Sequence, residues 1–554
     1  MTGADAQFLT DRFPLDEITA SLRSFGLSLV ADVPGGRDRS PPRRRSPHSV
    51  SEPEAVHRTW LDTFDWRLHG ANAELQQIDI DGRATLELRS SGGRAVRADG
   101  REIADLAWPA IAETLPGGPL QDCVAQLAGI RALQVTARAT VRRWTFRAVN
   151  GDDKTVARVL VEDEVSPCGD DDGVSVRIYV EPLRGYERPA RRIGTVLGSL
   201  PGVDAAPTSC YERILTAPTT GVRRPDAWGG GTDLHLTPSL PAASAVRAML
   251  CSFREAVLIN RPGVLEDVDT EFLHDLRVAV RRARSILKLT GDVLTETRVR
   301  ELATELKWLG DVTTPTRDLD VYLAEIPVMT KRLRAAAPTD LDAFGEHLRR
   351  RRGETLDQLR ADLTSERFAC LLHDWEAVVA EPDEPDPAET DSVDWDSDSE
   401  PVLRNGLTAT ALADERLTRA HRRVLKMGAA ITPASAPDRL HTLRKRCKEL
   451  RYLVEVFEPL EIPGARKRAL PVLKNLQDCL GEFQDSEVQA AAIRSYAAEM
   501  MSSASAAPGP LLAMGELAAQ LDADQRRSRE RFAGIFATFQ DATAKLRWTR
   551  GVRQ

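Results

Sequence analysis

The chain has 554 residues, too many for one hydrophobic core; 42% of them are hydrophobic and only 5% are aromatic, which is typical of helices packed through Leu, Ala and Val. It contains no run of 18 apolar residues and does not begin with a basic segment followed by an apolar one, so we expect no membrane span. Its seven cysteines are scattered singly, as expected of reduced residues in a cytoplasmic protein.

The formal net charge of -8 argues against an anion-binding protein, but the charge is unevenly distributed. Ten acids and no base fall between residues 381 and 400, so this stretch alone carries more negative charge than the whole chain does net. The other parts of the chain are therefore basic on balance.

In chain order, residues 1–50 form an N-terminal segment whose run GGRDRSPPRRRS, at 35–46, is typical of a disordered tether. Residues 51–217 read as an α+β domain of short antiparallel strands, a small barrel or a strongly curved sheet. A hairpin is predicted around Asp81 and Gly82, with further strands at 140–147, 155–165 and 174–182 and helices at 118–128 and 188–200.

The segments WLDTFDWRLHGANAEL, TLEL, VEDEVS and IYVEPL of this domain resemble the CYTH superfamily, which has the triphosphate tunnel fold. The resemblance implies triphosphate bound inside a barrel by basic residues, with a divalent metal held by acids that begin with an ExExK strand. This chain has no such motif near its start, and it reads Leu75-Gln76-Gln77-Ile78 where the family carries paired bases. Remnants of the family site would be Arg89, Glu162, Glu164, Arg177 and Glu181.

We therefore expect a degenerate CYTH-like barrel that serves as a scaffold or weak anion site, and we lean against an enzyme. A metal-dependent triphosphatase acting in this barrel is the alternative. No cofactor is expected unless the barrel is active, in which case a divalent metal is needed.

Residues 218–241 contain a triple glycine and flanking prolines and are predicted to be a linker. The rest of the chain is predicted to be all-α, as two repeated helical bundles at 242–380 and 405–550 that are separated by an acidic linker at 381–404. The expected helices cover 244–258, 270–290, 297–309, 319–336, 341–363, 368–380, 412–430, 437–457, 465–480, 486–502 and 511–546.

The repeat, with a period of 167 residues, is clearest in LHDLRVAVRRARSILKLT and LHTLRKRCKELRYLVEVF. Three cations follow each histidine at offsets of 3, 7 and 10, which places all four side chains within about 80° of one face of an α-helix. A lysine at offset 33 and an aspartate at offset 44 recur as well. The matched pairs are His274 and His441, Arg277 and Arg444, Arg281 and Lys448, Arg284 and Arg451, Lys307 and Lys474, and Asp318 and Asp485.

The doubled His-x-x-Arg helices, the segments KWLGDVTTPTRDLDV and KNLQDCLGEFQDSEV, and the RYLVEVF ending resemble the CHAD family, the conserved histidine α-helical domain. That resemblance implies an all-helical protein that binds inorganic polyphosphate and associates with its granules, often after a CYTH domain in the same chain.

We expect the site to be the paired basic stripes, because a linear polyphosphate needs many cations in a row. The predicted polyphosphate-binding residues are His274, Arg277, Arg281, Arg282, Arg284, Lys288, Lys307, His441, Arg444, Lys445, Lys448, Arg451 and Lys474. Two acids, Asp318 and Asp485, are expected either to hold a stripe arginine in position or to cap a helix.

Several alternatives remain open. Each histidine is either a phosphate donor or the cap of a preceding turn, and neither has a metal ligand at i+3 or i+4, so we expect no metal site. Nucleic-acid binding by the same helices is disfavoured because few aromatics accompany the bases. The acidic linker is either a spacer or an internal competitor for the basic stripes. Chain-length preference, oligomeric state and protein partners are not expressed in the sequence.

Overall fold

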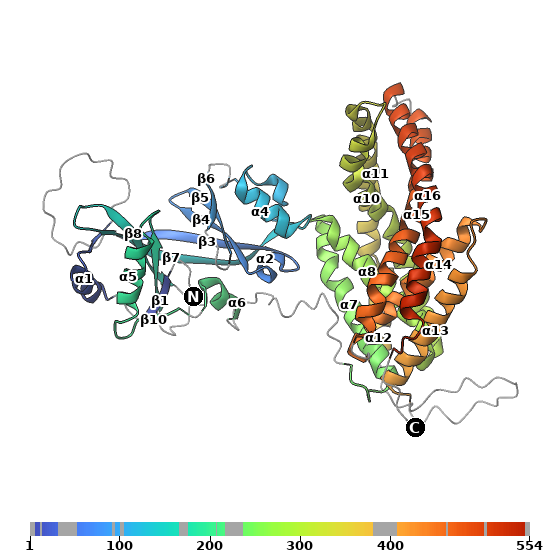
Figure 1. Ribbon diagram of the computed structural model, residues 1–554, viewed down its shortest axis with the longest axis horizontal. Coiled ribbons are helices and arrows are strands. Elements are labelled where there is room, and N and C mark those ends of the chain that lie inside the picture. The colour runs from blue at the N-terminus through green and yellow to red at the C-terminus, as the bar shows by residue number, and fades with distance from the viewer. Residues whose placement is uncertain are drawn as a thin grey trace. The chain divides into compact units, whose positions relative to one another are not determined.

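The structure is a computed structural model that describes residues 6–10, 14–31, 52–90, 95–99, 103, 105–164, 175–206, 208–216, 236–380, 407–460, 464–502 and 507–548. The chain divides into two compact units, Met1–Gly230 and Gly231–Gln554, each of which is described by itself (Figure 1). The basic run at 35–46, the acidic linker at 381–404 and most of the linker at 218–241 lie outside the described residues.

The N-terminal unit is built on one antiparallel sheet with the strand order β10-β1-β9-β8-β7-β3-β4-β5-β6, and β2 also pairs with β7. The strands are β1 (Ala6–Thr10), β2 (Ser28–Ala31), β3 (Glu54–Thr63), β4 (Ala73–Ile80), β5 (Arg83–Ser90), β6 (Val96–Asp99), β7 (Leu133–Val149), β8 (Thr155–Glu164), β9 (Ser175–Pro182) and β10 (Asp204–Ala205). The helices are α1 (Leu15–Arg23), α2 (Arg67–Gly70), α4 (Pro119–Ala128), α5 (Glu187–Leu197) and α6 (Cys210–Thr216).

The sheet curls so that strands far apart in its order approach each other. Arg97 on β6, at one end of the order, lies 3.4 Å from Glu181 on β9, near the other end. The predicted hairpin is also present, because Asp81 (φ 50°) and Gly82 (φ 75°) both adopt the positive φ angles that a two-residue turn between β4 and β5 requires. The predicted antiparallel α+β fold class is confirmed.

Strand β7 is longer than predicted and organises the sheet. It spans 17 residues and pairs with β3 through its first part and with β8 and β2 through its last part. The prediction covered only 140–147, although the first half also alternates between apolar and polar residues; two of its apolar positions are Ala137 and Ala139, and alanine is a weak strand former.

The C-terminal unit is helical, as predicted. Its helices are α7 (Ala242–Glu266), α8 (Thr270–Thr290), α9 (Glu296–Val312), α10 (Thr314–Arg332), α11 (Asp342–Leu363), α12 (Glu366–Ala380), α13 (Ala409–Ala429), α14 (Pro437–Val456), α15 (Ala465–Ser502) and α16 (Pro508–Thr543) (Figure 1). No helix among the described residues is both long enough and apolar enough to cross a bilayer.

The repeat extends through the helical unit, but the second repeat has the single helices α15 and α16 where the first has α9 with α10 and α11 with α12. The helices predicted at 465–480 and 486–502 form a single helix, α15, so the predicted break is wrong. At the equivalent place in the first repeat, the chain breaks between α9 and α10 at Thr313, where Pro315 lies in the first turn of α10. The second repeat has Glu482 instead of that proline, so the helical hydrogen bonding continues.

The two repeats share one core instead of packing as separate bundles. Phe344 of α11 and Leu319 of α10 pack in the same hydrophobic cluster as Ile493 of α15 and Met514 of α16. The equivalent segments that precede α7 and α13 also pair directly, because the backbone N–H of Ala242 donates to the carbonyl of Leu407 at 2.8 Å. Equivalent residues of the two repeats are thus brought together.

Candidate functional site

Helices α8 and α14 carry the two basic stripes, and each begins at a defined residue. The side chain of Asp269 caps α8 by accepting hydrogen bonds from the backbone N–H groups of Glu271 and Phe272 at 2.9 and 3.3 Å. Pro437 starts α14, where its fixed φ suits the first helical turn. The start of each stripe is therefore fixed by a different sequence signal, a side-chain cap in α8 and a proline in α14.

Two ion pairs join α8 to α14. Arg282 lies 3.1 Å from Glu455, and Lys288 lies 2.7 Å from Glu449. Arg282 occupies the position in the first repeat that Glu449 occupies in the second, and Lys288 the position that Glu455 occupies. The repeat therefore relates one ion pair to the other, with the base and the acid exchanged. Arg282 and Lys288, both predicted ligand residues, are thus already partly neutralised by carboxylates of the opposite helix.

The equivalent cations Arg281 and Lys448 come together where the helices meet. The guanidinium of Arg281 lies 5.7 Å from the centre of the Tyr452 ring on α14. Burial, together with the positive charges of Arg444 and Arg281, lowers the pKa of Lys448 to about 8, and Asp485 offsets this only in part. Among the described residues, no ion pair neutralises Arg281 or Lys448.

The equivalent residues Arg277 and Arg444 are held more tightly. One Nη of Arg277 donates to the carbonyl of Gly310 at 3.1 Å and to the hydroxyls of Thr313 and Thr314 at 2.8 and 2.9 Å. Arg444 donates to Asp485 at 3.0 Å. These two arginines are fixed in place, which lowers the entropy lost when an anion binds.

The two aspartates differ in their environments. Asp485 forms the ion pair with Arg444, whereas burial raises the pKa of Asp318 against the opposing effect of Arg277. Both carboxylates also act on the pKa of Tyr322, which is raised chiefly by burial, so the two equivalent acids approach the same ring.

The two histidines have different partners in the two repeats. Nδ1 of His441 donates to the side-chain carbonyl of Gln484 at 2.6 Å. Burial and the adjacent Arg317 lower the pKa of His274, so its imidazole is neutral at pH 7. The two histidines therefore have different hydrogen-bonding and charged neighbours, although their sequence context is duplicated.

Arg317 also lies at this site, although the matched cations of the two repeats did not predict it. It lies close enough to His274 and Asp318 to act on the pKa of each, and it donates to the backbone carbonyl of Thr270 at 3.3 Å. Its equivalent in the second repeat is Gln484, so no pair of matched cations marked the position. Its distance of 43 residues from His274 provides no local signal either.

The remaining predicted cations lie further along α8 and α14 or on α9 and α15, the helices that follow them. Arg451 donates to Glu455 at 2.6 Å and to Gln477 at 3.3 Å. The residue equivalent to Gln477 in the first repeat is Gly310, and a Cβ added to Gly310 would lie 2.8 Å from the guanidinium of Arg284. An exposed lysine lies three residues, or one helical turn, before Gly310, and another lies three residues before Gln477. A third exposed lysine lies on α14. These are Lys307, Lys474 and Lys445.

A groove with a volume of about 960 Å³ runs beside this cluster. Arg444, Lys448 and Arg451 of α14 line one side of it, and residues of α10, α15 and α16 line the rest. On that far side Arg332 pairs with Asp524 at 2.5 Å, and Arg531 pairs with Glu482. The lining has six cations and six carboxylates, and among these described cations the one without an ion pair is Lys448 on α14.

The charged interior of the N-terminal unit is arranged differently. Glu162 lies between Arg58 and Arg143 at 2.5 and 2.6 Å, and although burial opposes ionisation, the two arginines lower its pKa to about 2. Glu87 contacts both Arg89 and Arg97.

Two more of the residues predicted as remnants of a CYTH site, Arg177 and Glu181, also contact groups of the same unit. Arg177 donates to Gln7 at 3.2 Å and to the carbonyl of Thr208 at 2.8 Å, and Glu181 lies 3.7 Å from Arg89. The side chain of Glu164 lies outside the described part of the structure. Among the residues that the structure describes, no three His, Cys, Asp or Glu side chains are grouped to hold a metal.

Comparison with known proteins gives one match to a family model, which lies within the helical unit. A family model described as the CHAD domain matches residues 248–494. No curated protein matches the chain.

Among solved structures, the CHAD domain of the plant Ricinus communis is 24% identical, covers 57% of this chain and 96% of its own, and has a TM-score of 0.45. PptA of Streptomyces chartreusis is 20% identical with coverages of 55% and 98% and a TM-score of 0.39. A putative adenylyl cyclase of Hippeastrum, with a dominant triphosphatase activity, is 11% identical with coverages of 40% and 99% and a TM-score of 0.24. Through the family match, the chain carries a CHAD domain over residues 248–494 of its helical unit.

Proposed function

We propose that the CHAD domain of this chain binds inorganic polyphosphate where α8 and α14 meet, without turning it over. The observation that carries the proposal is the approach of Arg281 and Lys448, equivalent cations from the two repeats that have no acidic partner among the described residues. Arg281 is exposed and Lys448 is partly buried, and two like charges brought together in this way cost free energy that a polyanion bound to both would remove.

The neighbouring side chains fit a chain of phosphates better than a single small anion. Arg277 and Arg444 flank the central pair and are held by hydrogen bonds, so they present fixed guanidinium groups. Lys307, Lys445 and Lys474 are exposed and supply mobile point charges further out. A polyphosphate with about one charge per phosphate can contact both kinds of cation along its length, and such binding would hold the protein on polyphosphate granules in the cytoplasm.

Nucleic acid is a poorer candidate for the same surface. Binding of single strands generally uses aromatic rings on which bases stack. The aromatic ring that Arg281 contacts, Tyr452, is 8% exposed, and its face is occupied by that guanidinium. Competition of RNA against long-chain polyphosphate should therefore be weak.

The test is a titration of the full chain with long-chain polyphosphate at several salt concentrations. We expect the logarithm of the affinity to fall linearly with the logarithm of salt, because counterions are released on binding. The double variant Arg281→Gln, Lys448→Gln should lose roughly tenfold or more in affinity and reduce the salt slope by about 2, one for each lost contact.

A matched control removes two cations elsewhere in the same unit. Arg349 and Arg350 are exposed on α11 and pair with Glu346 and Glu354 at 2.8 and 2.9 Å. Arg349→Gln, Arg350→Gln should leave the affinity nearly unchanged. Equal losses in both double variants, or an affinity that does not respond to salt, would contradict the proposal.

A further inference from the structure

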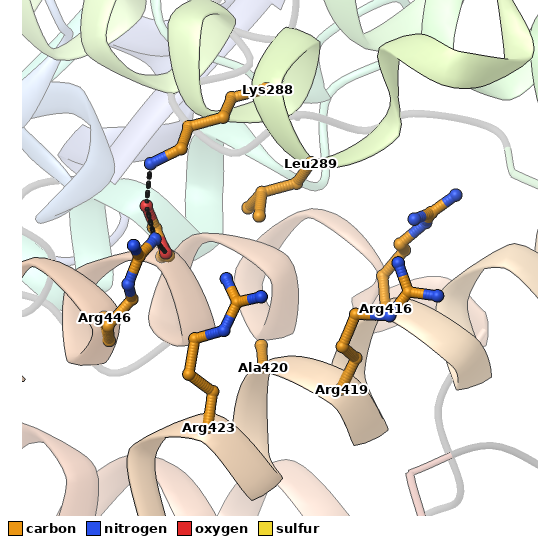
Figure 2. Close-up of a pocket in the computed structure, with 8 residues that line it drawn as sticks. Lys288, Leu289, Arg416, Arg419, Ala420, Arg423 and Arg446 are labelled. Carbon is orange, nitrogen blue, oxygen red and sulfur yellow. Dashed lines mark hydrogen bonds and ion pairs between the residues drawn. The ribbon is translucent and has the colours of Figure 1, made fainter. Parts of the chain in front are cut away.

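A second basic pocket lies among α8, α13 and α14 and shares no lining residue with the groove described above. It has a volume of about 110 Å³, which is room for a few water molecules. Figure 2 shows its lining side chains, which are Lys288, Leu289, Arg416, Arg419, Ala420, Arg423, Arg446 and Glu449. Five cations thus surround a space in which one carboxylate is present.

The ion pairs around this pocket do not neutralise all of its cations. Lys288 and Arg446 share Glu449, each at 2.7 Å. Two further carboxylates outside the lining contact the pocket arginines, since Arg416 pairs with Asp292 and Arg419 pairs with Glu415, each at 2.5 Å. Five cations therefore face three carboxylates.

Arg423 is the cation without an acidic partner among the described residues, and its guanidinium extends from α13 toward α8 between the other basic side chains (Figure 2). Two further N–H donors are available nearby, because the Nε atoms of Arg416 and Arg446 are buried and have no hydrogen-bond partner in the described structure. Buried donors of this kind are normally satisfied, so they indicate a missing acceptor.

The arrangement on α13 is unfavourable for the helix by itself. Arg416, Arg419 and Arg423 follow one another at spacings of three and four residues, which places three like charges on one stripe. An oxyanion bound against that stripe would offset the repulsion.

The pocket occurs in one repeat only. The positions equivalent to Arg416, Arg419, Arg423 and Arg446 in the first repeat are Met249, Ser252, Ala256 and Ala279. The duplicated basic stripes serve both repeats, whereas these four arginines belong to the second repeat alone. The pocket is therefore a feature separate from the duplicated surface.

We propose that this pocket binds one phosphate group, either free orthophosphate or the terminal phosphate of a short chain. The charge, the unsatisfied N–H donors and the small volume fit a compact, doubly charged tetrahedral anion, and the volume excludes a long chain lying inside it. This site does not depend on polyphosphate binding between Arg281 and Lys448.

The test is calorimetric titration of the full chain with orthophosphate and, separately, with tripolyphosphate. Arg423→Gln should weaken binding of the phosphate probe about tenfold, and the exposed neighbour Arg422, which does not line the pocket, provides the matched control Arg422→Gln. Because Arg423 is itself exposed, its replacement should leave the fold intact, and retained long-chain polyphosphate binding verifies this.

The two probes separate the two sources of the phosphate group. Orthophosphate binding that is lost in Arg423→Gln and kept in Arg422→Gln assigns the pocket to free phosphate. The same pattern seen with tripolyphosphate alone assigns it to chain ends. If neither probe distinguishes Arg423→Gln from Arg422→Gln, or if the losses follow Arg281→Gln, Lys448→Gln instead, the proposal is wrong, whatever the outcome for long-chain binding.

Discussion

The two units of this protein handle clustered charge in opposite ways. In the N-terminal sheet, Glu162 is 1% exposed and is neutralised by two arginines of the same unit, Arg58 and Arg143. In the helical unit, Arg281 and Lys448 approach each other with no acid between them in the described structure, and the pKa of Lys448 falls to about 8 as a result of burial and its basic neighbours.

This difference between the two units concerns the source of the counterion for each buried or clustered charge. A buried charge is tolerated when it is paired, and the sheet contains its own counterions. In the helical unit, Arg281 and Lys448 have no acidic partner among the described residues, so a ligand must supply their counterion. Removing one charge should therefore have opposite effects on stability in the two units.

The largest expected effect is in the sheet. Glu162→Gln leaves Arg58 and Arg143 as buried, uncompensated cations, so we expect the free energy of unfolding of the N-terminal unit to fall by about 3–5 kcal/mol. Urea unfolding followed by hydrogen exchange of β7 and β8 peptides measures it. Glu354→Gln removes an exposed acid that pairs with Arg350 and should change stability by no more than about 0.5 kcal/mol.

The same pair also predicts a pH dependence. Because the pKa of Glu162 is lowered to about 2 in the fold, its contribution to stability is fully present above the pKa of the unfolded chain, about 4.3, and is lost as the pH falls through about 2. Wild-type protein should lose this stability in acid, and Glu162→Gln should not. Equal acid sensitivity of the two proteins would show that the pair is not formed.

A smaller effect of opposite sign is expected in the groove. Lys448→Met removes a cation that the fold disfavours, so the free energy of unfolding at pH 7 should rise by about 1 kcal/mol, a figure reduced for the partial exposure of the amine. The pKa of Lys448 is lowered from 10.5 to about 8, so the unfolded chain binds more protons between these values and the wild type gains stability as the pH rises.

Urea unfolding at pH 7 and at pH 10.5, followed by hydrogen exchange of α14 peptides, checks this prediction. The advantage of Lys448→Met over the wild type should shrink at the higher pH. A variant that is less stable than the wild type at pH 7 would mean that Lys448 is held by a stabilising partner.

The smallest effect is expected at the histidines. Burial and Arg317 lower the pKa of His274, so at pH 7.5 it is uncharged and His274→Gln should change polyphosphate affinity by less than about twofold. A titration with long-chain polyphosphate at pH 7.5 measures the change. A tenfold loss would show that the ligand itself protonates the imidazole.

The sequence predicted most of the helices, and it predicted a set of matched cations because the repeat could be aligned residue by residue. Arg281 and Lys448 are matched in sequence and lie close to each other in the structure. Arg317 was missed because its equivalent, Gln484, is neutral.

Contacts between segments far apart in the chain could not be predicted from the sequence either. The ion pair of Lys288 with Glu449 joins helices 161 residues apart in the chain, and no pattern in either helix indicates the partner. The continuous α15 was missed for a related reason, because a proline breaks the equivalent stretch of the first repeat but is absent from the second.

The central claim is that a polyanion meets Lys448, and it can be tested through the proton that this amine takes up. Calorimetric titration of the full chain with long-chain polyphosphate at pH 8, in two buffers of different ionisation enthalpy, measures proton uptake directly. Because the pKa of Lys448 is about 8 and a bound polyanion raises it, wild-type protein should take up protons on binding. Lys448→Arg, which has at this position the residue type of Arg281, should bind with similar affinity and lose that uptake. No proton uptake by the wild type, or equal uptake by both proteins, would contradict the account.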